Sequence, residues 1–105
     1  MKAAVVHEWG QQPRYLDFPE PQPRDGTVVA AVEASALTNL SRMVIMGKHY
    51  SSKEIQLPAI AGVDGVVRLE DGTRVYTGSL APYGLMAERT LLYPSGGVPV
   101  PEHVD

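Results

Sequence analysis

The feature that most constrains this chain is its density of residues that interrupt regular structure. Ten glycines and nine prolines are spread over 105 residues, a larger share than the roughly 12% of an average protein. Proline lacks a backbone N–H and glycine is conformationally free, so both end helices and strands early. The hydrophobic fraction of 44% is nevertheless sufficient for a core. These proportions favour one small domain built from short strands and turns.

Apolar runs between the turn residues predict a mainly β chain. Residues 14–18 alternate, with Leu16 and Phe18 on one face and polar or aromatic neighbours on the other. Residues 27–34 form the longest run, and their small alanines predict a strand packed closely on both faces. Further strands are expected at residues 2–7, 59–69 (interrupted by two glycines), 74–76 and 84–93, with an extended tail at 98–104.

One hairpin and one helix complete the expected elements. The dipeptide Asp71-Gly72 is typical of a tight turn between two antiparallel strands. Residues 39–46 change to a helical period, and either Thr38 or Asn39 can cap the first turn. Several short strands with one short helix predict a small β-barrel or sandwich.

Composition excludes several classes of function. The chain has no cysteine, which rules out disulfides, thiol nucleophiles and the usual structural zinc site. Its formal charge of −3 is poorly suited to the phosphate backbone of nucleic acids. No apolar run approaches the roughly 20 residues that span a bilayer, and the run at residues 3–6 is too short for a signal peptide. We therefore expect a soluble, cytoplasmic protein that binds neither nucleic acid nor membrane.

Three local motifs that would carry chemistry are missing. His7, His49 and His103 lie far apart without acidic partners at metal-ligand spacing, so no metal site is predicted. The segment GVDG at residues 62–65 matches neither the GxGxxG fingerprint nor a P-loop, so no dinucleotide-binding motif is present. The GxSxG signature of a serine nucleophile is also absent.

Asp64 is the first candidate site residue because it interrupts the apolar stretch 59–67. A carboxylate in such a stretch must be neutralised, paired with a cation or hydrated. Asp64 is therefore either a structural turn acid, paired with Arg42 or Arg89, or a group that shapes a pocket.

The start of the expected helix is the second candidate. Thr38 and Ser41 are three residues apart and therefore neighbours on one helix face. Hydroxyls at this position either cap the helix or contact a ligand. The following loop, with His49 and Tyr50, can form one wall of a substrate pocket.

Several segments of the chain also occur in a characteristic order. They are MKAAVVHEWG, PEPQPRDGTVVAAVEASAL, MVIMGKHYSS, LPAIAGVDGVV, DGTRVYTG, YGLMAERTLL and the closing VPVPEHVD. Together they resemble the N-terminal half of the medium-chain dehydrogenase/reductase superfamily, most closely its zinc-independent quinone oxidoreductase branch. The resemblance implies that residues 1–105 form a GroES-like catalytic domain, a bent β-barrel with one short helix. In the family a Rossmann domain follows, and nicotinamide and substrate meet in the cleft between the two domains.

The resemblance also implies the metal and cofactor contacts. Zinc-using members carry a cysteine and a Gly-His-Glu where this chain has Thr38 and GVD at residues 62–64, which implies that no metal is bound. Zinc-free relatives usually have Asn-Pro-x-Asp at the helix start, where this chain has TNLS at 38–41. Thr38 and Ser41 thereby take the positions that face the nicotinamide of NADP(H).

Substrate contacts are implied in the same way. Tyr50 matches a loop tyrosine that lines the active-site cleft in many relatives. With Thr38 it is the expected catalytic residue, while His49 and Asp64 are expected to line the substrate pocket beside it.

The implied reaction is hydride transfer between NADP(H) and a quinone, enone or related carbonyl compound. The dinucleotide-binding domain expected after Asp105 is absent from these residues, so we expect a catalytic-domain fragment that is inactive and binds no cofactor without its Rossmann partner. The alternative is a stand-alone, non-enzymatic GroES-like module for binding or assembly. A third possibility is a degenerate duplicate, which the departures at Thr38 and Ser41 support.

Overall fold

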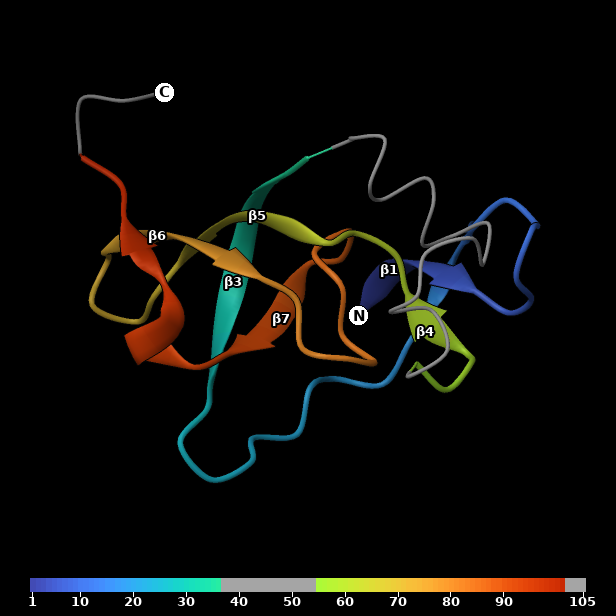
Figure 1. The fold of residues 1–105 in the computed structure, drawn as a ribbon, viewed down its shortest axis with the longest axis horizontal. Coiled ribbons are helices and arrows are strands. Elements are labelled where there is room, and N and C mark those ends of the chain that lie inside the picture. The colour runs from blue at the N-terminus through green and yellow to red at the C-terminus, as the bar shows by residue number, and fades with distance from the viewer. Residues whose placement is uncertain (37–54, 102–105) are drawn as a thin grey trace.

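The structure, a computed structural model, describes residues 1–36 and 55–101. These residues form two antiparallel sheets (Figure 1). The first has the order β2-β1-β4, with strands β1 (Lys2–Val6), β2 (Arg14–Asp17) and β4 (Ala59–Ile60). The second has the order β7-β3-β5-β6-β8, with strands β3 (Val28–Ser35), β5 (Asp64–Arg68), β6 (Arg74–Gly78), β7 (Arg89–Leu92) and β8 (Val98–Pro99). A 3-10 turn, η2 (Pro94–Gly96), joins β7 to β8.

Residues 86–88 connect the two sheets. The Ala4 N–H of β1 donates to the carbonyl of Met86 at 2.8 Å, and the Val32 N–H of β3 donates to the carbonyl of Glu88 at 3.0 Å. This segment therefore runs between β1 and β3, at the middle of the molecule in Figure 1. The bond on each side ties the two sheets together, and the mainly β architecture that the strand pattern predicts is confirmed. Among the described residues, no helix is long and apolar enough to cross a membrane.

Each sheet has its own apolar core, because alternate residues of a strand face the same side. The core of the first sheet is the buried cluster of Ala3, Val5 and Ile60, with Leu16 and Phe18 of the predicted alternating run packed against it. The core of the second sheet is the buried cluster of Ala30, Val67, Val75, Leu85 and Leu92. The alternation predicted at residues 14–18 is thus confirmed, and Tyr15, on the other face, is 75% exposed.

The prediction that residues 27–34 pack closely on both faces is wrong. Within β3 only Ala30 is buried, while Val28 and Ala31 are exposed. Small side chains allow close packing on both faces but do not require it, and the described residues supply no layer over the outer face of β3. The helix predicted at residues 39–46 lies outside the described residues.

The predicted hairpin between β5 and β6 is confirmed. Gly72 has a φ of 89°, a conformation that glycine adopts at little cost. The Asp71 Oδ1 accepts a hydrogen bond from the Thr73 N–H at 2.9 Å, and this bond fixes the turn. The resulting register places Asp64 opposite Gly78.

Candidate functional site

Most of the predicted site residues lie outside the part of the chain that the structure describes. Thr38, Ser41, His49 and Tyr50 fall in residues 37–54. Their proposed roles therefore stay predictions. Asp64 is the predicted site residue that the structure does place.

Asp64 is the first residue of β5, and its carboxylate is bound by a tyrosine of the neighbouring strand. The Tyr76 hydroxyl of β6 donates a hydrogen bond to Asp64 Oδ2. In the register of the hairpin Tyr76 lies opposite Val66, so the contact to Asp64 is diagonal, a separation that an aromatic side chain can span. Gly78 lies directly opposite Asp64 and places no side chain there. The carboxylate and the phenol can therefore meet over the sheet.

Arg89 is not the partner of Asp64, although the sequence left that pairing open. Its Nε and Nη2 donate to the two carboxylate oxygens of Glu20 at 2.5 and 2.8 Å. The other suggested partner, Arg42, lies outside the described residues. Asp64 is thus held by a neutral phenol rather than by Arg89.

The carboxylate changes the acidity of its partner. The hydrogen bond to Asp64 raises the pKa of Tyr76, and desolvation and the carboxylate charge add to the effect. The cause is that a phenolate beside a carboxylate would place two negative charges together. Tyr76 therefore remains a protonated donor at neutral and mildly alkaline pH.

Two polar atoms near this contact have unused hydrogen-bonding capacity. Asp64 Oδ1 and Ser35 Oγ are both buried, and neither has a hydrogen-bond partner among the residues described. They lie on neighbouring strands but on opposite faces of the sheet, because Ser35 pairs with Gly65, the residue after Asp64, and successive residues of a strand face opposite sides. An ionised carboxylate only accepts hydrogen bonds, whereas a hydroxyl both donates and accepts. Asp64 Oδ1 therefore has the capacity to accept one further hydrogen bond, and Ser35 Oγ, on the other face, the capacity to donate or accept one.

The glycines that interrupt the apolar stretch allow this close arrangement. A Cβ on Gly65 would overlap the carbonyl oxygen of Ala34 on β3. Gly62 has a φ of 104°, and a Cβ there would lie 2.9 Å from the Met86 nitrogen. At both positions the backbone of another segment lies so close that a side chain would push the two segments apart. The glycines on both sides of Asp64 are thus packing requirements of the site.

The described residues suit some ligands better than others. No group of three or more His, Asp or Glu residues that could hold a metal ion occurs in residues 1–36 and 55–101. A carboxylate repels phosphate, so Asp64 does not fit the phosphates of a dinucleotide. It does fit a neutral N–H or O–H donor, such as a carboxamide or an alcohol.

Tyr76 is the site residue that the sequence interpretation missed. The hairpin motif alone does not reveal it. Counting outward from a two-residue turn at Asp71-Gly72 places residue 67 opposite residue 76, whereas the structure places Val66 opposite Tyr76 and so brings Tyr76 onto the face of Asp64.

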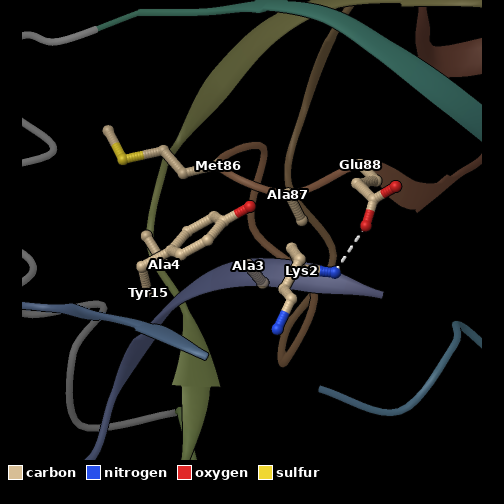
Figure 2. Close-up of a pocket in the computed structure, with 7 residues that line it drawn as sticks. All are labelled: Lys2, Ala3, Ala4, Tyr15, Met86, Ala87 and Glu88. Carbon is tan, nitrogen blue, oxygen red and sulfur yellow. Dashed lines mark hydrogen bonds between the residues drawn. The ribbon is translucent and has the colours of Figure 1, made fainter. Parts of the chain in front are cut away.

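A separate shallow hollow of about 280 Å³ lies over β1 (Figure 2). It is lined by Lys2, Ala3, Ala4, Tyr15, Met86, Ala87 and Glu88. The charged groups at its rim are already engaged, since the Lys2 N–H donates to Glu88 Oε1 at 2.6 Å and Lys2 Nζ pairs with Asp17 at 3.1 Å. Its lining includes neither Asp64 nor Tyr76. This hollow is therefore not part of the Asp64 site.

Comparisons with known proteins identify the fold. No protein-family model matches the chain, and no curated protein sequence matches it. Among solved structures, it is similar to the quinone oxidoreductase from Thermus thermophilus, which was also determined in complex with NADPH. That similarity has 31% identity and a TM-score of 0.85, and it covers all of this chain and 34% of the other.

Two further structures agree in fold. The quinone oxidoreductase from Coxiella burnetii is 19% identical with a TM-score of 0.86, and the match covers all of this chain and 38% of the other. An alcohol dehydrogenase superfamily protein from Novosphingobium aromaticivorans is 24% identical with a TM-score of 0.80, and the match covers all of this chain and 36% of the other. The chain thus spans little more than a third of the length of these relatives. Its fold is the GroES-like N-terminal domain of the medium-chain dehydrogenase/reductase superfamily, as the resemblance implied.

Proposed function

We propose that this chain is the substrate-binding part of an NADP(H)-dependent, zinc-independent oxidoreductase that reduces a quinone, an enone or a related carbonyl compound. The observation that carries the proposal is the similarity at 31% identity, over the whole chain, to a quinone oxidoreductase that binds NADPH. NADPH, when bound in an intact two-domain enzyme, would supply the hydride. The chain itself would supply position and hydrogen bonds.

The proposed roles of the individual residues follow from their chemistry. Tyr50 donates a hydrogen bond to the carbonyl oxygen of the substrate as negative charge develops there. Thr38 and Ser41 face the carboxamide side of the nicotinamide, while His49 and Asp64 line the substrate pocket. Asp64 is supported in this role by its buried Oδ1, which has no partner among the described residues.

A chimeric enzyme tests the proposal directly. The 105 residues would replace the corresponding part of the Thermus thermophilus quinone oxidoreductase, and NADPH oxidation with 1,4-benzoquinone would be followed at 340 nm. We expect turnover by the chimera and none by the 105-residue chain without its Rossmann partner. Tyr50→Phe should lower kcat by about tenfold or more, since it removes one donor to the developing charge. Tyr15→Phe is the matched control, because Tyr15 is exposed on β2.

The other outcomes have definite meanings. Turnover by the 105-residue chain without a Rossmann domain would contradict the proposal that hydride transfer requires both domains. A chimera that folds and binds NADPH but reduces no quinone or enone would overturn the proposal and favour a non-enzymatic binding module. Full activity of the Tyr50→Phe chimera would overturn the role of Tyr50 alone.

A further inference from the structure

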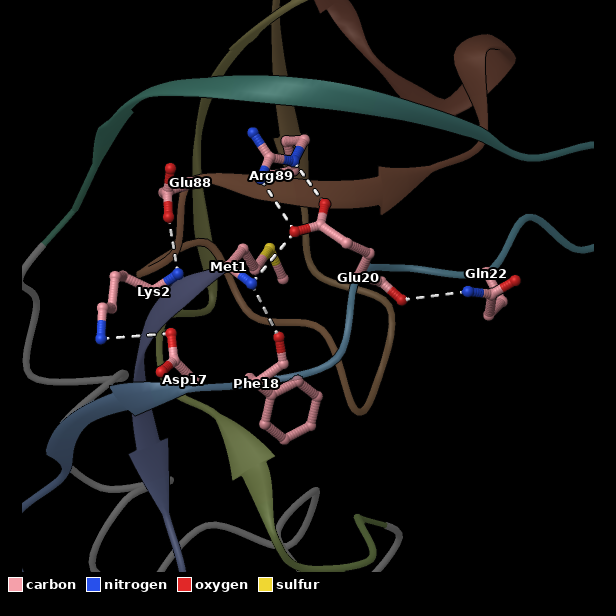
Figure 3. Close-up of polar contacts among 8 residues, drawn as sticks. All are labelled: Met1, Lys2, Asp17, Phe18, Glu20, Gln22, Glu88 and Arg89. Atoms are coloured by element: carbon pink, nitrogen blue, oxygen red, sulfur yellow. Dashed lines mark hydrogen bonds and ion pairs between the residues drawn. The ribbon is translucent and has the colours of Figure 1, made fainter.

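The α-amino group of Met1 takes part in an ionic cluster at the junction of the two sheets (Figure 3). The Met1 ammonium donates to the carbonyl oxygen of Phe18 at 3.0 Å and pairs with Glu20 Oε2, also at 3.0 Å. Arg89 of β7 holds the same carboxylate with two hydrogen bonds. Glu20 is therefore bound by two cations from different parts of the fold.

This cluster, which we call the amino clamp (Met1, Glu20 and Arg89), joins three segments that are distant in sequence. Met1 precedes β1, Glu20 lies in the connector after β2, and Arg89 begins β7. Prolines on both sides of Glu20 stiffen the connector, and one of them, Pro21, is buried. Glu20 is thus presented at a defined place, where a change in either cation is not easily absorbed by movement of the connector.

We propose that the Met1 α-amine is a modification-sensitive site. A free amine forms the ion pair with Glu20 that completes the amino clamp, and an acyl group on the amine removes this ion pair. Acylation by an acyl thioester forms an amide N–C bond and breaks the C–S bond. The ammonium loses two protons, of which one ends on the departing thiol and one in solvent. The amide that results has no positive charge for Glu20 and keeps a single N–H. It can serve Phe18 or Glu20, but not both.

We expect the modification to precede folding. In the folded chain the amine is hydrogen-bonded and partly buried, and both restrict its attack on an acyl donor. An acyl group added to the unfolded chain would remain during folding, and the domain would then form with Glu20 held by Arg89 alone.

The test compares two forms of the 105-residue chain, one with a free α-amine and one with an Nα-acetyl group, after intact mass has verified Met1 in both. We expect the acetylated form to melt about 3 °C lower or more, as for the loss of one partly buried ion pair in a small domain. In Glu20→Gln the same acetylation should shift Tm by less than about 1 °C, because this variant has no carboxylate at position 20 and the ion pair with Met1 is already lost. Asp17→Asn, which removes the neighbouring Lys2–Asp17 pair, is the matched control and should keep the full effect of acetylation.

Two outcomes would overturn the proposal. One is an unchanged Tm in the acetylated wild-type chain. The other is an equal shift in wild type and Glu20→Gln, which would place the effect outside the clamp. If Glu20→Gln does not fold, the rate at which acetic anhydride acylates the α-amine decides. We expect this rate to be at least about fivefold lower in the folded chain than in the peptide MKAAVV, and equal rates would overturn the proposal.

Discussion

Two carboxylates in this small domain are used in opposite ways. Glu20, at the junction of the sheets, has both oxygens bound by cations. Asp64, at the start of β5, has one oxygen bound by the Tyr76 hydroxyl and a second, buried oxygen without a partner among the described residues. A fully paired carboxylate stabilises its fold, whereas a buried, half-paired one costs stability and keeps its capacity for a ligand. The comparison separates a structural acid from a candidate functional one.

The largest expected effect comes from Gly65→Ala, which disturbs the backbone beneath Asp64. The added methyl group would overlap the Ala34 carbonyl oxygen, which is backbone and cannot turn away. We expect a loss of about 3 kcal/mol in the free energy of unfolding, measured by urea denaturation. Gly96→Ala is the control, because a Cβ there meets no atom within 4 Å. Equal stability of the two variants would show that the strands are farther apart than described.

Glu20→Gln is expected to have the next largest effect, since it removes the anion of the amino clamp. Two cations lose their partner in one substitution. We expect Tm to fall by about 3 °C or more, by differential scanning calorimetry. Glu70→Gln, at an exposed position after β5, should leave Tm nearly unchanged. A clamp that contributes nothing would give the two variants the same Tm.

Protonation of Glu20 at low pH should weaken the ion pairs of the amino clamp. Hydrogen bonds from Arg89 and from the Met1 ammonium lower the pKa of Glu20 from 4.5 to about 2. The folded state therefore binds the proton less readily than the unfolded state. This stabilisation is fully present above about pH 4.5 and is lost as the pH falls toward 2.

Thermal unfolding between pH 6 and pH 2 measures that loss. The difference in Tm between wild type and Glu20→Gln should shrink steadily below pH 4.5. Asp71→Asn is the comparison for an acid that has no cation as partner. In the wild-type chain hydrogen bonds with Thr73, and not an ion pair, lower the pKa of Asp71. A constant difference between wild type and Glu20→Gln down to pH 2 would exclude the charge of Glu20 as the cause.

The smallest effect on stability is expected for Asp64→Asn. Its hydrogen bond is to a neutral, partly exposed tyrosine, so we expect Tm to change by less than about 2 °C in either direction. The clear response is in Tyr76, whose raised pKa should return toward its ordinary value once the carboxylate is gone. NMR of ¹³C-labelled tyrosine would follow it, with Tyr76→Phe identifying the signal. An unchanged Tyr76 titration would contradict the contact.

Much of the fold could be predicted from local chemistry. The alternation at residues 14–18, the Asp71-Gly72 turn and the interruption of residues 59–69 all appear in the structure. Each depends on side-chain period or on the conformational freedom of glycine, and both are properties of a few neighbouring residues. The burial of β3 on both faces was wrong because burial depends on what other segments cover.

The candidate site could be predicted only in part, for the same reason. Asp64 stands out because a carboxylate in an apolar run needs an explanation. The partner of Asp64 could not be predicted from charge alone. Charge favours Arg89, but in the structure Arg89 binds Glu20. The hairpin register brings Tyr76 to Asp64 instead.

The sequence by itself therefore determined a domain rich in strands and turns and the order of its segments. It also identified Asp64 as a carboxylate in an apolar stretch that needs a hydrogen-bond or ionic partner. Only the tertiary structure decided which groups meet. Arg89 follows Glu20 by 69 residues, and Met1 reaches both through the pairing of β1 with its neighbours. Contacts across such separations depend on how whole strands are placed, and no local pattern of residues contains that information.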